Sequence, residues 1–146
     1  MPFAHLHVHS HYSLLTSPAR IDALLDRAQE LGMTALALTD YTALYGAVEL
    51  SIKAKERHMK PIIGAEIYVT ANMHSRVSIE DRRRSNLVLL AETQAGYQNL
   101  MKIISESHIE GFYYKARVDK ELLLKYHEGI IALSGSVTGE VPSLIV

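Results

Sequence analysis

Short blocks of apolar residues alternate between the two-residue period of a strand and the longer period of a helix. Between residues 3 and 9, Leu6 and Val8 alternate with histidines, which predicts a strand. A helical stripe follows at Ile21, Leu24, Leu25, Ala28 and Leu31. Ser17 is predicted to cap this helix, with Pro18 at its first position and Gly32 just beyond its end.

The same reading continues along the rest of the chain. Strands are predicted over 34–39, 61–69, 87–91 and 129–134, and helices over 44–57, 95–107 and 119–126. Asp119 is the predicted cap of the last helix. The helix over 95–107 should bury one stripe, made of Tyr97, Leu100, Met101 and Ile104. Strands that alternate with helices predict an α/β fold with a mainly parallel sheet.

Composition bounds the class of protein. The chain has 146 residues, 48% of them apolar, and a mean hydropathy of +0.04, so we expect one folded domain. Fifteen basic against sixteen acidic side chains argue against a broadly basic surface that coats nucleic acid. The absence of cysteine excludes disulfides and thiolate metal sites. There is no signal-peptide pattern and no apolar run of membrane length, which predicts a cytoplasmic location.

Two stretches read as surface loops. The first, 72–86, contains the run 80–84 (EDRRR), which is a solvated turn or an anion contact, and the mixed charge favours the turn. The second, 111–118, is aromatic and basic together. Tyr113 or Tyr114 would stack on a base or pack onto the sheet, and packing is the favoured interpretation.

Four of the eight histidines stand at positions 5, 7, 9 and 11. On an extended segment, this alternation sends all four side chains to the same side. Imidazole is a favoured ligand for zinc and similar ions, and i, i+2 spacing can bring two rings to one ion. We expect His5 and His7 to be ligands, and His9 and His11 to support them or to be exposed.

Two acidic residues add to this pattern. Glu66 lies in the apolar strand PIIGAEIYV, where a carboxylate is costly unless a cation or hydrogen-bond donors meet it. It is a metal ligand or half of a buried salt bridge, and the histidines favour the ligand. Asp40 ends a strand, where parallel sheets place functional groups, although it could equally cap the turn that follows.

Several segments, in order, resemble one known family. HLHVHSHYSLL, ELGMTALALTD with LYGAVE, KPIIGAEIYV, GYQNLMKII, EGFYYKARVDKELL and HEGIIALSG are similar to the PHP (polymerase and histidinol phosphatase) domain, in the form carried by the alpha subunit of bacterial replicative DNA polymerase III. The resemblance covers nearly the whole chain. It implies the first half of a distorted (β/α) barrel, so residues 1–146 are expected to be a partial PHP domain whose later strands and polymerase body are absent.

The resemblance also implies a metal site at one end of the barrel. Active members hold up to three divalent metals that bind phosphate oxygens and activate water for phosphoester hydrolysis. His5 and His7 match the first two ligands and Glu66 matches the glutamate of the third strand, so zinc or manganese is the implied cofactor.

Other family ligands are replaced. An acidic residue is replaced by Thr16, a histidine by Tyr41, another histidine by Asn86, and a common cysteine by Ser136. Threonine, tyrosine and asparagine are poor ligands for divalent metals. We therefore expect no multinuclear cluster, a poorly occupied site and little or no hydrolysis.

The leading hypothesis is a structural and interaction module of a DNA-directed DNA polymerase, a nucleotidyltransferase of DNA replication, with a degenerate metal site. The alternative is an active metal-dependent phosphoesterase, either a 3′–5′ proofreading exonuclease or a small-substrate phosphatase. A stand-alone nucleic-acid-binding domain is the weakest candidate, because the charge is balanced. Implied partners are the rest of the alpha subunit, other replication subunits and DNA through the parent enzyme, but no membrane. An incomplete barrel exposes sheet edges, so the isolated chain should self-associate.

Overall fold

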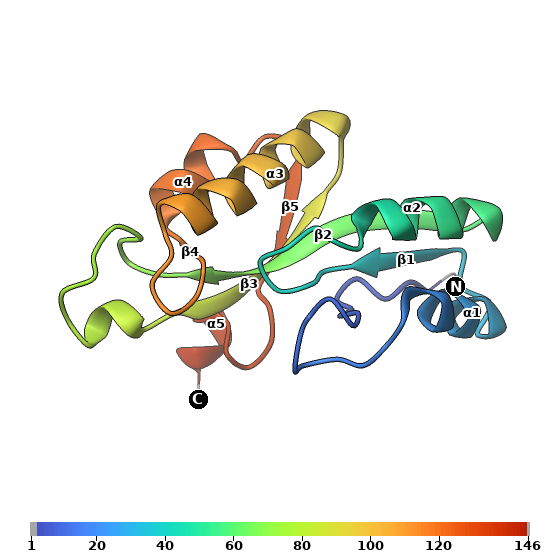
Figure 1. Cartoon of the computed structure of the whole chain (residues 1–146), viewed down its shortest axis with the longest axis horizontal. Coiled ribbons are helices and arrows are strands. Elements are labelled where there is room, and N and C mark those ends of the chain that lie inside the picture. The colour runs from blue at the N-terminus through green and yellow to red at the C-terminus, as the bar shows by residue number, and fades with distance from the viewer. Residues whose placement is uncertain (1–2, 146) are drawn as a thin grey trace. The chain divides into compact units, whose positions relative to one another are not determined.

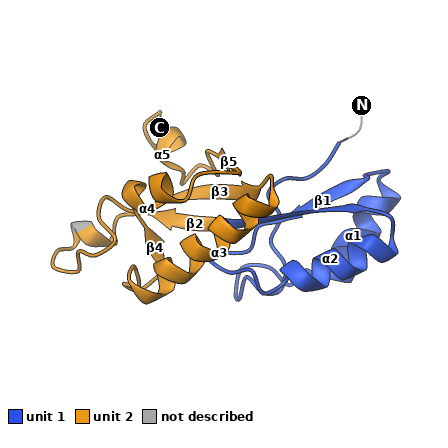
Figure 2. Cartoon of the chain, turned by 90° about the horizontal axis from the view of Figure 1, so that it is seen from above, with its two compact units in different colours: residues 1–65 blue, residues 66–146 orange. Residues whose placement is uncertain are grey.

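The computed structural model describes residues 3–145, apart from the side chain of Glu80. Residues 1, 2 and 146 of the expected domain lie outside this range. The chain divides into two compact units, Met1–Ala65 and Glu66–Val146 (Figure 2). Helices and strands alternate in both, which confirms the α/β class (Figure 1).

The first unit contains two helices and two paired strands. Its elements are α1 (Ile21–Glu30), β1 (Ala35–Leu38), α2 (Ala47–Glu56) and the first part of β2 (Lys60–Val69). β1 and β2 are parallel, in a register that runs from Ala35 opposite Lys60 to Leu38 opposite Ile63. Buried residues from both helices and from β1, including Ile21, Leu25, Leu36 and Leu50, form its core.

The second unit is built around the end of β2. Its further elements are the 3-10 helix η1 (Glu80–Arg82), β3 (Ser85–Ala91), α3 (Gln94–Ile109), β4 (Arg117–Val118), α4 (Lys120–Lys125), β5 (Ile130–Leu133) and α5 (Glu140–Ser143). β4 is parallel to β2, whereas β5 is antiparallel to β3. The sheet is therefore mixed, and the expectation of a mainly parallel sheet does not extend to β5.

The predicted strand over residues 3–9 is wrong, although the segment lies beside β1. Ala37 N–H donates to the His5 carbonyl at 3.0 Å and Thr39 N–H donates to the Val8 carbonyl at 2.8 Å. In the return direction, however, the Val8 N–H donates to the Thr39 hydroxyl at 2.9 Å. Because a side chain takes the place of a backbone carbonyl, no regular ladder forms.

Helix α1 begins at Ile21 rather than at the predicted Ser17 cap. Arg20 is the N-cap residue and makes no side-chain cap hydrogen bond. The Ser17 hydroxyl instead donates to the His9 carbonyl at 2.9 Å and accepts from the Ala19 N–H at 3.2 Å. The helix end agrees with prediction, because Gly32 has a φ of +72° just beyond the C-cap residue.

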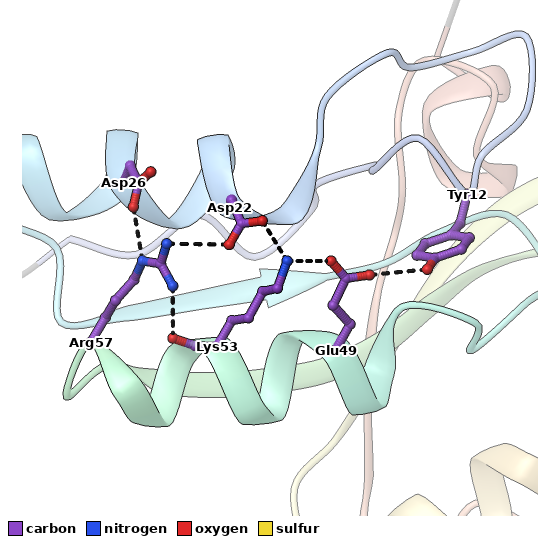
Figure 3. A network of polar contacts seen from close by, with 6 residues as sticks. All are labelled: Tyr12, Asp22, Asp26, Glu49, Lys53 and Arg57. Carbon is purple, nitrogen blue, oxygen red and sulfur yellow. Dashed lines mark hydrogen bonds and ion pairs between the residues drawn. The ribbon is translucent and has the colours of Figure 1, made fainter.

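Polar side chains join α1 to α2 (Figure 3). Lys53 of α2 contacts Asp22 of α1 and donates to Glu49 at 2.7 Å. Arg57 donates to Asp26 at 2.8 Å and to Asp22 at 3.2 Å. The two helices are therefore linked by ion pairs on top of their shared apolar core.

Helix α3 buries a different stripe from the predicted one. Its buried residues are Gly96, Leu100, Ile103 and Ser107, whereas Met101 is 38% exposed. A Cβ on Gly96 would lie 1.8 Å from the Gly129 carbonyl oxygen, so the backbones of α3 and the turn before β5 are in direct contact. Because of this contact, small residues of α3 face inward. A prediction that looks for large apolar side chains cannot identify such a buried face.

The last predicted elements have mixed outcomes. Asp119 caps α4 as predicted, accepting a hydrogen bond from the Leu122 N–H at 3.0 Å. β5 is not fully buried, and Ile131 on it is 43% exposed.

Candidate metal centre

Glu66 is a buried carboxylate in the middle of β2. Only 1% of the residue is exposed. The side-chain amide of Asn86, at the start of β3, donates to Glu66 Oε1 at 2.5 Å. A carboxylate is costly to bury without donors or cations, and this amide meets part of that need.

The histidine row meets different neighbours along its length. The His5 ring contacts Phe3, with ring centroids 4.9 Å apart. His7 and His9 are in edge contact at 5.1 Å, and His9 also lies 4.4 Å from the Tyr41 ring. The His11 ring lies 4.3 Å from the Tyr12 ring.

Asp40 holds the loop that follows the histidines. It is 2% exposed. Its carboxylate accepts hydrogen bonds from the N–H and hydroxyl of Ser10, each at 2.7 Å, and from the Ser13 hydroxyl at 2.6 Å. Of its two sequence interpretations, the geometry favours a structural cap, although the capped loop is residues 10–13 rather than the turn after Asp40. Sequence reasoning missed Ser10 and Ser13, because no local pattern links them to a residue about thirty positions away.

Three of these side chains form a group that could hold a metal ion. His7, His9 and Glu66 each offer one ligand atom, and these atoms lie within 4.8 Å of one another. The group contains His7 and Glu66 of the predicted set, with His9 in place of His5. Two imidazoles and one carboxylate form a donor set that suits zinc or manganese.

The replaced family positions fall in two classes. Tyr41 contacts His9 and Asn86 contacts Glu66, so both substitutions lie directly beside candidate ligands. Thr16 and Ser136 are exposed, and Ser136 shares a hydrogen bond with Thr138 at 2.9 Å. The asparagine amide already donates to one Glu66 oxygen, and one group of candidate ligands is found among the described residues. The residues present therefore fit one ion better than a cluster.

Tyr68, two residues after Glu66, is kept neutral. Burial raises the pKa of its phenol, the Arg84 guanidinium lowers it, and the Glu66 carboxylate raises it further. Tyr68 therefore adds no charge to this stretch of β2 at neutral pH.

Comparison with known proteins defines the class. Residues 5–146 match the PHP domain family, and this chain belongs to that family. Among its relatives, it is 42% identical over 146 residues to the DNA polymerase III subunit alpha of Borreliella burgdorferi, with 99% of this chain covered. It is 43% identical over 148 residues to the same subunit of Treponema pallidum, with 100% covered. The match spans only 13% of each of these relatives.

Solved structures share the fold. An amidohydrolase from Chromobacterium violaceum, with bound sulfate and no metal, aligns with a TM-score of 0.54 at 24% identity, covering 73% of this chain and 33% of that one. A protein from Bifidobacterium adolescentis, described as a metal-dependent phosphoesterase, aligns with a TM-score of 0.50 at 15% identity, covering 75% and 35%. Within residues 3–145, no helix is both long and apolar enough to cross a membrane.

Proposed function

We propose that this chain is part of the PHP domain of a bacterial replicative DNA polymerase III alpha subunit, and that it serves as a structural and interaction module in DNA replication. The observation that carries the proposal is about 42% identity to such subunits along the whole chain. The partners that follow are the remainder of the alpha subunit, other replication subunits, and DNA through the parent enzyme. Nucleotidyl transfer would belong to other parts of that enzyme.

We infer that His7, His9 and Glu66 bind a single divalent ion, zinc or manganese. The support is the grouping of their ligand atoms within 4.8 Å and the chemistry of the donor set. Such an ion would supply Lewis-acid stabilisation of a phosphate oxygen when bound. The substitutions at Tyr41 and Asn86 remove the extra donors of a cluster, so hydrolysis is expected to be weak or absent.

The test is metal content per chain, measured by mass spectrometry on the 146-residue protein purified without chelator or affinity histidines. We expect zinc or manganese to bind at up to one equivalent, lost in His7→Ala and in His9→Ala. His5→Ala is the matched control, since the sequence interpretation makes His5 a ligand and the structural group does not include it. Binding that survives His9→Ala but not His5→Ala would restore the sequence interpretation. Metal below about a tenth of an equivalent in the wild type would leave only the structural role.

A second candidate function is an active metal-dependent phosphoesterase, a 3′–5′ exonuclease or a small-substrate phosphatase. It is favoured by the retained group of two histidines and one glutamate. Nucleotide release from a DNA 3′ end, abolished in His7→Ala, would establish this activity and displace the purely structural proposal.

A further inference from the structure

The two loops that the sequence separates, 72–86 and 111–118, form one surface in the second unit. Arg82 Nη2 donates to the Tyr114 hydroxyl at 2.9 Å, and its guanidinium carbon lies 4.5 Å from the centre of that ring. Arg117, only 1% exposed, donates to the carbonyls of Met73, Ser75 and Asp81 in the first loop and to that of Gly111 in the second. The buried guanidinium of Arg117 thus links the two loops through hydrogen bonds.

This surface is strongly basic, although the chain is nearly neutral. The two loops contain six of the fifteen basic residues but only two of the sixteen acidic ones, and all of these six cations except Arg117 are exposed. Backbone N–H donors of Ser78 and Val77 hold the pKa of Asp81 below its usual range, so one acid is already engaged with the loop's own backbone. The remaining cations therefore give a local positive field that the overall charge of −1 conceals.

Exposed aromatic rings lie among these cations. Phe112 is 53% exposed and Tyr114 is 62% exposed, and both precede Lys115. Tyr114 has a φ of +61°, an uncommon conformation for a side chain of its size. Such a conformation is strained and tends to occur at functional positions. The ring is exposed to solvent, so the favoured sequence interpretation, packing onto the sheet, does not hold for Tyr114.

A cavity of about 560 Å³ continues the basic surface beyond Arg82. Arg83, Arg84 and Lys120 line it together with Glu121 and Glu140. Glu140 pairs with Lys120 at 2.7 Å, so the arginines supply its excess positive charge.

We propose that Arg82, Arg84, Tyr114 and Lys115 form a binding surface for single-stranded nucleic acid. The cations contact phosphates, and exposed rings accept unpaired bases by stacking. A duplex keeps its bases stacked on one another and would leave the aromatic residues unused. The inference does not need the metal centre, since every residue that carries it lies in the two loops.

The experiment is fluorescence anisotropy of the full 146-residue chain with a labelled oligothymidylate of about 15 nucleotides, repeated over a series of salt concentrations. Each phosphate contact on a single strand contributes about 0.7 to the slope of log Kd against log salt. The double variant R82A/R84A is expected to lower this slope by about 1.4 and to weaken binding at least tenfold at low salt. Tyr114→Ala should weaken binding about 5- to 150-fold without changing the slope.

Two controls separate a specific surface from general charge. Lys102→Ala removes a cation of the same unit that also lies near a tyrosine, 5.3 Å from the Tyr126 ring, and should bind as the wild type does. Tyr114→Phe keeps the ring and should also bind. Thermal melting confirms that each variant is folded.

Absence of binding by the wild type at low salt would overturn the proposal. So would an equal loss in Lys102→Ala, or an unchanged affinity in Tyr114→Ala. Competition by polyglutamate as strong as that by oligothymidylate would assign the surface to an acidic protein instead. Metal content is measured on the same samples. It shows whether the metal site is intact when nucleic-acid binding is lost, so the two proposals can fail separately.

Discussion

At the scale of residues, the side-chain partners of two buried carboxylates, Asp40 and Glu66, indicate different roles for them. Asp40 accepts three hydrogen bonds from Ser10 and Ser13, which engages both of its oxygens within a loop. Glu66 accepts from Asn86 and belongs to the group with His7 and His9. Because neutral donors already surround Asp40, it is suited to holding backbone in place, whereas Glu66 lies in a group that could hold a metal ion.

The sequence could identify the histidine row but not the pair that groups with Glu66. The same i, i+2 relation joins His5 to His7, His7 to His9 and His9 to His11. Only the path of the chain beside β1 distinguishes these pairs. The carboxylate, in contrast, was predictable, because an acid within an apolar strand requires a partner wherever the strand lies.

Replacing Gly96 with alanine tests the close contact between α3 and the turn before β5. The added Cβ would lie 1.8 Å from a backbone oxygen, so something must shift, and we expect a loss of about 3 kcal/mol of unfolding free energy in urea. Gly32→Ala is the matched control. Nothing lies within 4 Å of its Cβ, and its positive φ alone should cost about 1 kcal/mol. Equal costs at the two positions would show that α3 can shift away from the turn.

At the scale of elements, periodicity located most helices and strands because it records which face is buried. It succeeded for α1, whose buried residues Ile21, Leu25 and Ala28 follow helical spacing. It failed for residues 3–9, where a threonine hydroxyl interrupts the ladder, and for the buried face of α3, where a glycine makes the contact. Both failures arise from contacts with residues distant in the sequence, which leave no trace in a local pattern of apolar residues.

The ion pairs between α1 and α2 predict a pH dependence of stability. A hydrogen bond from Lys53 lowers the pKa of both Asp22 and Glu49, which remain charged in the folded chain. A carboxyl whose pKa falls on folding stabilises the fold at neutral pH, and this contribution disappears as pH drops below about 4.

In Lys53→Met, the contribution of these two carboxylates to folding stability should be smaller. The urea concentration at the unfolding midpoint should therefore change less between neutral and acid pH than it does in the wild type. Arg27→Met is the control, because Arg27 pairs with Glu30 on the surface, where the two side chains are 68% and 64% exposed. Parallel pH profiles for Lys53→Met and the wild type would contradict this role.

At the scale of the whole molecule, exposed apolar surface predicts self-association of the isolated chain. β5 pairs with β3, and Ile131 on β5 is 43% exposed. An accessible strand with apolar side chains can pair with another copy. We expect sedimentation velocity to show concentration-dependent association, reduced in Ile131→Lys. Ile109→Lys, at an isoleucine that is 73% exposed at the end of α3, should leave association unchanged. A single monomer boundary at all concentrations, with cooperative melting, would refute the expectation.

The net charge is also a property of the whole molecule, and it does not reveal how charges are distributed locally. The balanced total of fifteen basic and sixteen acidic residues argues against a uniformly basic surface. It cannot report that basic residues collect on two loops, since the sequence separates those loops by twenty-four residues and the fold unites them.

Arg117 has a consequence for how this chain can change over generations. Among the described residues, the four groups that accept hydrogen bonds from Arg117 are main-chain carbonyls, which every amino acid carries. Mutations at Met73, Ser75 or Asp81 can therefore alter the chemistry of the loop while its anchorage persists. Substitutions in the loop can therefore change what this surface binds, provided that Arg117 itself is retained.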